Sequence, residues 1–144
     1  MDDTTGHGKT AALSDALVIF GATGDLAQRK IYPALEALAQ HGRLDMPVVA
    51  IARGDVGGDD GLRNLVRRSI ERAQVQDAGL VAKMRYLRGD YLDKATYQRL
   101  GEMLNGARKP LFYLAIPPST FPDVVRCLGR ASLAHGRVVV EKPF

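Results

Sequence analysis

Short apolar runs alternate along the chain with segments whose apolar residues recur at helical spacing. Five runs have the length of buried strands: 17–20, 48–52, 84–87, 111–116 and 137–141. Between them, apolar residues lie three or four positions apart within the four segments 31–38, 62–70, 100–104 and 121–128. This alternation predicts an α/β fold of the Rossmann type. We expect a doubly wound parallel sheet of about five strands with helices on both faces, and hence three layers.

The first 15 residues stand outside this alternation. They are polar, with an acidic start, and lack the basic start and apolar stretch of a signal peptide. We therefore expect a flexible leader over 1–15 and one domain over 16–144, a length that fits about one domain. The composition, 46% apolar and 25% charged, is typical of a soluble globular protein. No apolar run approaches the roughly 20 residues of a membrane helix, so no membrane partner is expected.

A glycine-rich turn follows the first strand and leads into the first helix. Its residues are Gly21, Ala22, Thr23, Gly24, Asp25 and Leu26. A glycine at a sharp turn can adopt positive φ, and without a Cβ it lets the backbone approach phosphates closely. The helix that follows directs its free N–H groups toward an anion. The spacing Gly-x-x-Gly-x-x-Ala is a variant of the dinucleotide fingerprint, and its context predicts a pyrophosphate site.

Arg53 comes directly after the second strand, where this fold selects between two cofactors. An acidic residue here bonds the ribose 2′-hydroxyl of NAD, whereas an arginine accommodates the 2′-phosphate of NADP. Arg53 therefore favours NADP, although Asp55 could still turn toward the ribose. The net charge of +4 fits an anionic partner. The basic residues are scattered and Trp is absent, so a phosphorylated small molecule is favoured over nucleic acid.

Prolines and one cysteine give further local predictions. Pro33 cannot donate to the carbonyl of Arg29, which predicts a short helical turn, a break near Tyr32 and then the main helix. Two prolines end the fourth strand, and Ser119 or Thr120 is expected to cap the next helix.

Cys127 is the only cysteine, so an internal disulfide and a cysteine metal site are excluded. A buried thiol and a reduced, cytoplasmic location are expected.

Four motifs in order resemble the glucose-6-phosphate dehydrogenase family, particularly its bacterial members. They occupy residues 21–35, 50–53, 113–118 and 140–144. The resemblance implies that residues 21–26 hold the pyrophosphate of NADP and that Arg53 takes its 2′-phosphate. It also implies roles for residues in the other loops: Asp90, Tyr91 and Phe121 beside the cofactor, Lys142 touching both cofactor and sugar phosphate, Pro143 in the cis form, and Lys30 directed toward the active site.

The same resemblance implies oxidation of glucose 6-phosphate at C1, with hydride passing to NADP, in the oxidative pentose phosphate pathway. In the family, the histidine base, its Asp partner, the substrate motif and most oligomer contacts belong to a larger part that follows the Glu-Lys-Pro-Phe motif. His7, His41 and His135 do not match that base. A well-placed base contributes about 10² to 10⁴ in rate. We therefore expect this chain to bind NADP as a coenzyme domain, without a metal and with negligible turnover of its own.

Other interpretations remain open from the sequence. The chain could be a stand-alone NADP-binding module that acts with a partner chain, because such a module keeps the same cofactor residues. Nucleic-acid binding would predict steeply salt-dependent association with DNA and is disfavoured. A truncated product that folds poorly would expose the sheet surface that normally packs on the larger domain.

Overall fold

The structure, a computed structural model, describes residues 14–77, 79–133 and 137–140, and it contains one parallel sheet. The strands are β1 (Ala16–Phe20), β2 (Val48–Ala52), β3 (Met84–Arg88), β4 (Pro110–Leu114) and β5 (Arg137–Val140). Their order across the sheet is β3-β2-β1-β4-β5, and every neighbouring pair is parallel. The expected five-strand Rossmann-type fold is confirmed.

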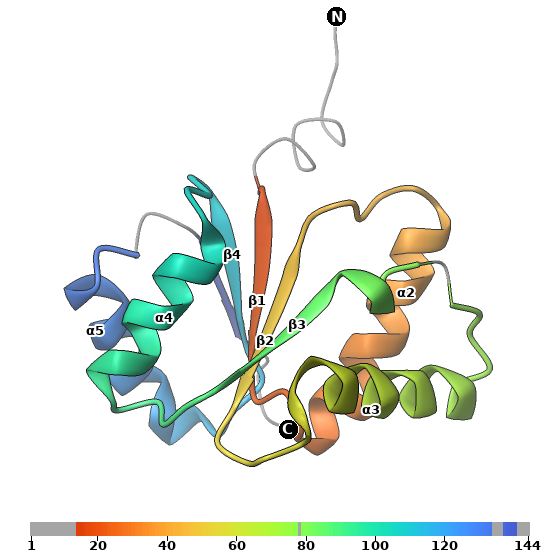
Figure 1. Cartoon of the computed structure of the whole chain (residues 1–144), viewed down its shortest axis with the longest axis horizontal. Coiled ribbons are helices and arrows are strands. Elements are labelled where there is room, and N and C mark those ends of the chain that lie inside the picture. Colours follow the sequence, from red (N-terminus) through yellow and green to blue (C-terminus); the bar gives the residue numbers. More distant parts are fainter. Residues whose placement is uncertain (1–13, 78, 134–136, 141–144) are drawn as a thin grey trace, which may run out of the picture.

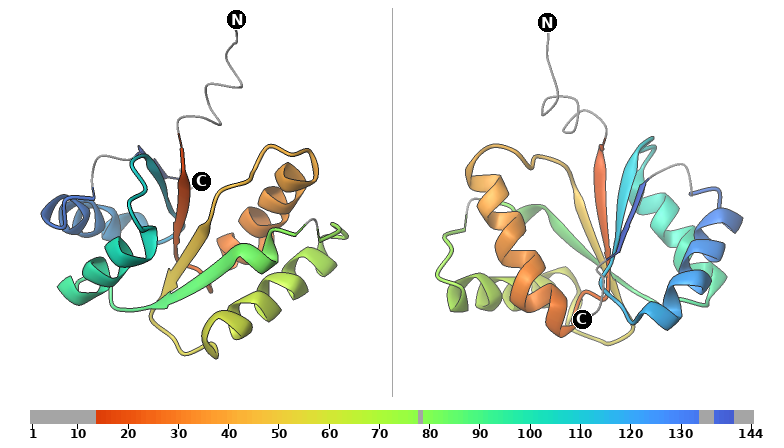
Figure 2. Two further views of the ribbon diagram at one scale, coloured as in Figure 1. Left: turned by 45° about the horizontal axis from the view of Figure 1, so that its top comes forward. Right: turned by 180° about the vertical axis from the view of Figure 1, so that it is seen from behind.

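Helices cover both faces of this sheet, as Figure 1 shows. The α-helices are α2 (Tyr32–Gln40), α3 (Gly58–Arg72), α4 (Lys94–Leu104) and α5 (Phe121–Arg130). Shorter turns are η1 (Ala27–Ile31), η2 (Val81–Lys83) and η3 (Pro118–Thr120). The pair α2 and α3 lies on one face and the pair α4 and α5 on the other, an arrangement seen again from behind in Figure 2. The result is the three-layer architecture that the alternation predicted.

The central strand β1 supplies apolar side chains to both layers, which is why its sequence shows no polar alternation. Leu17 and Ile19 join the cluster beneath α2 and α3, together with Leu62 and Val66 of α3. The intervening residues of β1 join the second cluster, against α4 and α5. All five residues of β1 are buried. The strand therefore has almost no freedom to slip, because a one-residue shift would exchange its two faces.

The sheet order creates a change of direction beside β1. The chain runs outward through β2 to β3, then returns to the other side of β1 for β4 and β5. In open α/β sheets the crevice outside the carboxyl ends at such a switch point is where ligands bind. The loops after β1, β2, β3 and β4 meet at this edge, which is the lower edge of the sheet in Figure 1.

The helix after the glycine-rich turn differs from its prediction. The chain is helical from Asp25 to Gln40 without a break, and η1 is a π-helical turn in which the amide of Tyr32 donates to the carbonyl of Ala27. Pro33 is the second residue of α2 and directly follows this widened turn; it has no N–H to donate to a carbonyl of the preceding turn. The proline is therefore accommodated by a widened turn, and the predicted break near Tyr32 is wrong.

Three smaller differences concern element ends. Ser14 is only 8% exposed, and Asp15 accepts the amides of Arg108 and Lys109 at 2.7 and 2.9 Å, so the fold begins at least two residues inside the predicted leader. Residues 1–13 lie outside the described part. β4 ends at Leu114, before the prolines. Thr120 precedes α5 without a side-chain capping bond, because the η3 turn already leads into the helix.

Candidate functional site

The turn at residues 21–26, here called the glycine loop, is shaped by close contact with the end of β4. Gly21 has φ +94°, and a Cβ at this position would lie 2.1 Å from the carbonyl oxygen of Ala115. Both the backbone conformation and the lack of space therefore require glycine. The amide of Ala115 in turn donates to the carbonyl of Phe20 at 2.9 Å. The turn is fixed beside β4, at the switch point of the sheet.

One carbonyl of β2 holds the start of the glycine loop. The Ile51 oxygen accepts the amides of Gly21 and Ala22, each at 3.0 Å, and the hydroxyl of Tyr91 at 3.2 Å. These three donors come from the loops after β1 and β3. The loop residues and Arg53, two positions beyond Ile51, are thereby brought to the same edge.

Side chains of the following helix hold two carbonyls of the glycine loop, those of Ala22 and Thr23. The Tyr32 hydroxyl is buried and donates to the Ala22 carbonyl at 2.6 Å, and burial raises the pKa of this tyrosine. The side-chain amide of Gln28 donates to the Thr23 carbonyl at 2.8 Å, while Arg72 of α3 donates to the Gln28 side-chain oxygen at 3.2 Å. Sequence reasoning missed these contacts. The loop carbonyls are thus engaged on the protein side.

The amides at the start of the helix have no carbonyl of their own helix to bond. Its first backbone hydrogen bond runs from Gln28 to the Gly24 carbonyl at 3.1 Å, so the amides of Asp25 and Leu26 precede it. A Cβ on Gly24 would lie 3.4 Å from its nearest neighbour, the Gly21 carbonyl, so no protein atom demands glycine there. The geometry matches an anion-binding helix start. Asp25 itself is exposed and lies 3.7 Å from Arg29.

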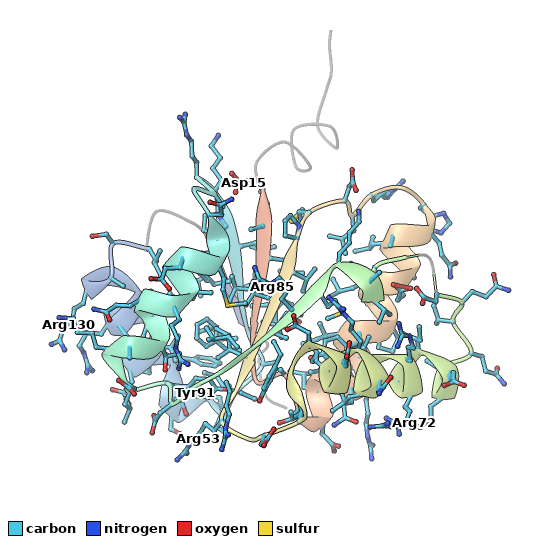
Figure 3. The ribbon with its side chains drawn as sticks, viewed as in Figure 1. Asp15, Arg53, Arg72, Arg85, Tyr91 and Arg130 are labelled. Carbon is cyan, nitrogen blue, oxygen red and sulfur yellow. The ribbon has the colours of Figure 1, made fainter. Side chains whose placement is uncertain are left out.

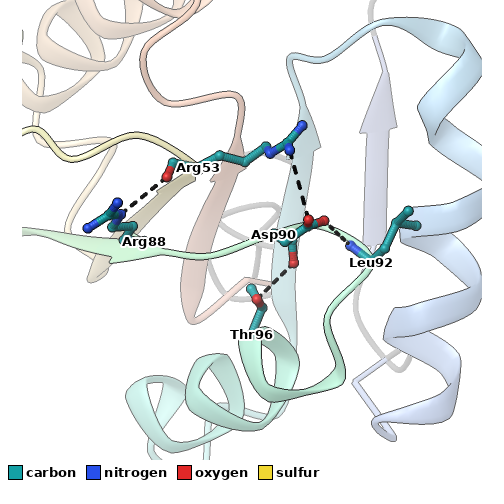
Figure 4. A network of polar contacts seen from close by, with 5 residues as sticks. All are labelled: Arg53, Arg88, Asp90, Leu92 and Thr96. Carbon is teal, nitrogen blue, oxygen red and sulfur yellow. Dashed lines mark hydrogen bonds and ion pairs between the residues drawn. The ribbon is translucent and has the colours of Figure 1, made fainter.

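Arg53 lies at the same edge, across the loop that follows β3 (Figure 3). Its guanidinium lies 3.9 Å from the Asp90 carboxylate, and the two side chains are 72% and 51% exposed. Asp90 is itself held in place: its carboxylate accepts the Leu92 amide at 2.9 Å, and its carbonyl accepts the Thr96 hydroxyl at 2.8 Å. Figure 4 shows this network. Sequence-predicted residues Arg53 and Asp90 are therefore neighbours.

Arg88, the last residue of β3, also contacts this edge and was not singled out from the sequence. Its Nε donates to the Arg53 carbonyl at 3.3 Å (Figure 4), and its guanidinium lies 4.0 Å from the Asp55 carboxylate. The signal that could have found it is register: Ala52 of β2 pairs with Arg88, so the two strands end together. We call Arg53, Asp55, Arg88 and Asp90 the arginine edge.

Tyr91 joins the glycine loop to the second core. Its ring lies 5.7 Å from that of Phe20, centroid to centroid, and the Tyr97 hydroxyl donates to its carbonyl at 2.7 Å. Burial raises the pKa of Tyr91 to about 12, since its ionised form would lose solvation. The hydroxyl therefore remains a donor to Ile51 across the physiological pH range.

The other predicted site residues are more dispersed. Lys30 is exposed on η1, and Phe121 is half-buried at the start of α5, just beyond β4. Lys142 and Pro143 lie outside the described residues. Cys127 is half-buried, not buried as expected, because it lines a groove of about 600 Å³ between α4 and α5.

The described ranges offer neither a metal site nor a membrane-spanning helix. They contain no cluster of three or more His, Cys, Asp or Glu side chains arranged to hold a metal ion. Nor does any helix in them have the length and apolar character needed to cross a bilayer.

A parallel sheet in this order, with a glycine turn at its switch point, defines an α/β domain of the Rossmann type. The family model described as "Glucose-6-phosphate dehydrogenase, NAD binding domain" matches residues 18–144. The chain belongs to this family.

Relatives and solved structures agree with that assignment. "Glucose-6-phosphate 1-dehydrogenase 1" of Mycobacterium bovis is 40% identical over 136 residues, which cover 91% of this chain and 29% of the relative. The crystal structure of glucose-6-phosphate 1-dehydrogenase from Mycobacterium avium superposes with a TM-score of 0.82 at 38% identity, covering 91% of this chain and 30% of that one. A structure titled "Glucose-6-phosphate dehydrogenase in complex with its substrate glucose-6-phosphate" gives 0.75 at 29% identity, covering 91% and 31%. The chain thus spans about 30% of the length of its relatives.

Proposed function

We propose that this chain is the NADP-binding part of a glucose-6-phosphate 1-dehydrogenase. The glycine loop would hold the pyrophosphate through the amides at the start of the helix, and Arg53 would bind the 2′-phosphate. Asp90, Tyr91 and Phe121 would lie beside the cofactor. Lys142 would contact both the cofactor and the sugar phosphate, and Lys30 would be directed toward the active site.

One observation carries this proposal. The Ile51 carbonyl accepts two amides of the glycine loop, and Arg53 follows two residues later. An anion-binding helix start and an exposed arginine therefore share one edge at the switch point. A pyrophosphate and a 2′-phosphate are separated by one ribose, so a single dinucleotide offers anions to both.

The reaction of the whole enzyme would be oxidation of glucose 6-phosphate at C1 to 6-phosphogluconolactone, with NADP as hydride acceptor. The described residues would bind and orient the dinucleotide; the catalytic base and the sugar pocket are assigned to the rest of the parent enzyme. The proposed reaction is supported by the relatives, which are glucose-6-phosphate 1-dehydrogenases and of which this chain covers about 30%. A cytoplasmic location stays part of the proposal.

The test is calorimetric titration of the chain with NADP and with NAD, alongside Arg53→Ala. We expect NADP to bind more tightly than NAD, and the substitution to weaken NADP by roughly ten- to a hundredfold while NAD changes little, because only NADP carries the 2′-phosphate. Arg43→Ala, an exposed arginine after α2, is the matched control. Equal affinities for both nucleotides would contradict the role of Arg53. A folded chain that binds neither would contradict the proposed function itself.

A further inference from the structure

The loop after β2 carries two residues with opposing preferences. Arg53 suits a 2′-phosphate, whereas an acidic residue in this loop suits the free ribose 2′-hydroxyl of NAD and repels a phosphate. Asp55 is that acidic residue, two positions after Arg53. The orientation of Asp55 therefore bears directly on which nucleotide the edge prefers.

The structure shows Asp55 engaged on the side of β3. One carboxylate oxygen accepts the Gly57 amide at 3.0 Å, and the other lies 4.0 Å from the Arg88 guanidinium. The first contact orients the carboxylate within its own loop. The second contact draws the carboxylate toward a cation, Arg88, on the neighbouring strand β3.

Side chains at the end of β3 contact three consecutive residues of this loop, Arg53, Gly54 and Asp55. Tyr86 donates its hydroxyl to the Gly54 carbonyl, and Arg88 donates Nε to the Arg53 carbonyl at 3.3 Å while its guanidinium faces Asp55. Tyr86 and Arg88 are two positions apart, so they lie on the same face of the strand. Because Ala52 pairs with Arg88 in the sheet, these contacts lie at the carboxyl ends of β2 and β3.

We propose that Arg88 is a specificity-determining residue, which favours NADP over NAD by holding the Asp55 carboxylate away from the ribose. This inference rests on the proposed function. Arg88 acts here through Asp55, so it is a positioning residue, and no contact between it and the nucleotide is required. Because both side chains are well exposed, 62% for Arg88 and 72% for Asp55, the pair is screened by water and its effect is moderate.

The experiment measures the dissociation constants of NADP and NAD for the chain and for Arg88→Ala. We expect the NADP preference, expressed as the ratio of the two constants, to fall about three- to tenfold. Arg88→Lys should restore part of it, since the charge facing Asp55 is retained. The matched control is Arg85→Ala, which removes the same charge from the opposite face of β3. It should leave the ratio within twofold.

Repeating the measurement in an Asp55→Asn background shows whether Arg88 acts through Asp55 or through its own charge. Asparagine retains an oxygen for the Gly57 amide but loses the charge. If Arg88 acts through Asp55, Arg88→Ala should change the ratio less than twofold in this background. An equal loss in both backgrounds would overturn the positioning role and assign the effect to the charge of Arg88 alone.

The outcomes also separate this inference from the proposed function. An unchanged ratio in Arg88→Ala and in Arg88→Gln, with NADP preference still dependent on Arg53, would overturn the inference and leave the function standing. If the unsubstituted chain is folded but binds neither NADP nor NAD, both the inference and the proposed function are overturned. Thermal unfolding of each variant verifies that it is folded.

Discussion

The glycine loop and the arginine edge are neighbours, yet they are held by different kinds of contact. The glycine loop is fixed by backbone groups and by the buried Tyr32 hydroxyl, with Gly21 in a conformation that other residues rarely adopt. The arginine edge is held by two exposed ion pairs, at 3.9 and 4.0 Å, and by hydrogen bonds that are mostly at the surface, such as the one from Nε of Arg88 to the Arg53 carbonyl. Buried hydrogen bonds are costly to break, whereas exposed ion pairs contribute about 0–1 kcal/mol. The first region is therefore built for fixed geometry, and the second for adjustable preference.

The sharpest test of the fixed region is Gly21→Ala. We expect the free energy of unfolding to fall by about 3 kcal/mol or more, because the new Cβ would meet the Ala115 carbonyl at 2.1 Å and the backbone has positive φ. Urea denaturation measures this change. Gly42→Ala is the control: it also has positive φ but no atom within 4 Å, so its loss should be smaller. Equal losses would show that conformation alone, and not contact with β4, makes Gly21 necessary.

Tyr32→Phe tests the buried hydroxyl in the same region. Removing it leaves the Ala22 carbonyl without this donor, and we expect a loss of about 1–2 kcal/mol in the free energy of unfolding. Tyr86→Phe, which removes an exposed hydroxyl bond to Gly54, should cost less. If both cost the same, burial would not be what distinguishes the two regions.

Gly24→Ala probes the side of the glycine loop that faces away from the protein. Its Cβ would lie 3.4 Å from the Gly21 carbonyl, so stability should change by under about 0.5 kcal/mol. Binding of NADP and NAD should each weaken by roughly tenfold, since the methyl group would keep the backbone from the pyrophosphate. Calorimetry and denaturation on the same sample separate the two effects. Lost stability with unchanged affinity would reverse the roles assigned to the two glycines.

Alkaline pH should destabilise the fixed region through Tyr91, whose hydroxyl donates to the same Ile51 carbonyl as the glycine loop. Its pKa is about 12 in the folded chain against 10.0 ordinarily, so the unfolded state loses this proton first as pH rises. The corresponding stability is fully present below pH 10 and lost between about pH 10 and 12. The free energy of unfolding should therefore decline less steeply in Tyr91→Phe over this interval. Identical slopes would contradict the assignment.

The smallest expected effect is that of Asp90→Asn at the adjustable edge. Asparagine can still accept the Leu92 amide, while the negative charge beside Arg53 is removed. NADP should bind about two- to threefold more tightly, and 0.5 M salt should reduce this gain because the groups are exposed. NAD affinity is the internal control and should not change. Weaker NADP binding would mean that Asp90 supports the site by another route.

Much of the fold could be predicted because its signals are local. The apolar runs gave all five strands, and the position of Arg53 followed from the end of β2 alone. The contacts of Arg88 depend on which strands pair and in which register, and the contact of Tyr32 depends on helix geometry; the spacing of apolar residues alone determines neither. The helix break predicted from Pro33 is wrong because a π-helical turn, which the sequence pattern does not reveal, accommodates the proline within a continuous helix. The cofactor roles assigned to the site residues stay predictions.

The triple use of the Ile51 carbonyl has a practical consequence for redesigning cofactor choice. Any exchange that moves the backbone of β2 would disturb the amides of Gly21 and Ala22 together with Tyr91, and so would damage binding of every dinucleotide. The side chains at 53 and 55, in the loop after β2, and at 88, the last residue of β3, take no part in these hydrogen bonds to the Ile51 carbonyl. If the proposed function holds, these three positions can therefore be randomised as a small library, in which nucleotide choice varies while the scaffold proposed to bind the common part of both nucleotides stays unchanged.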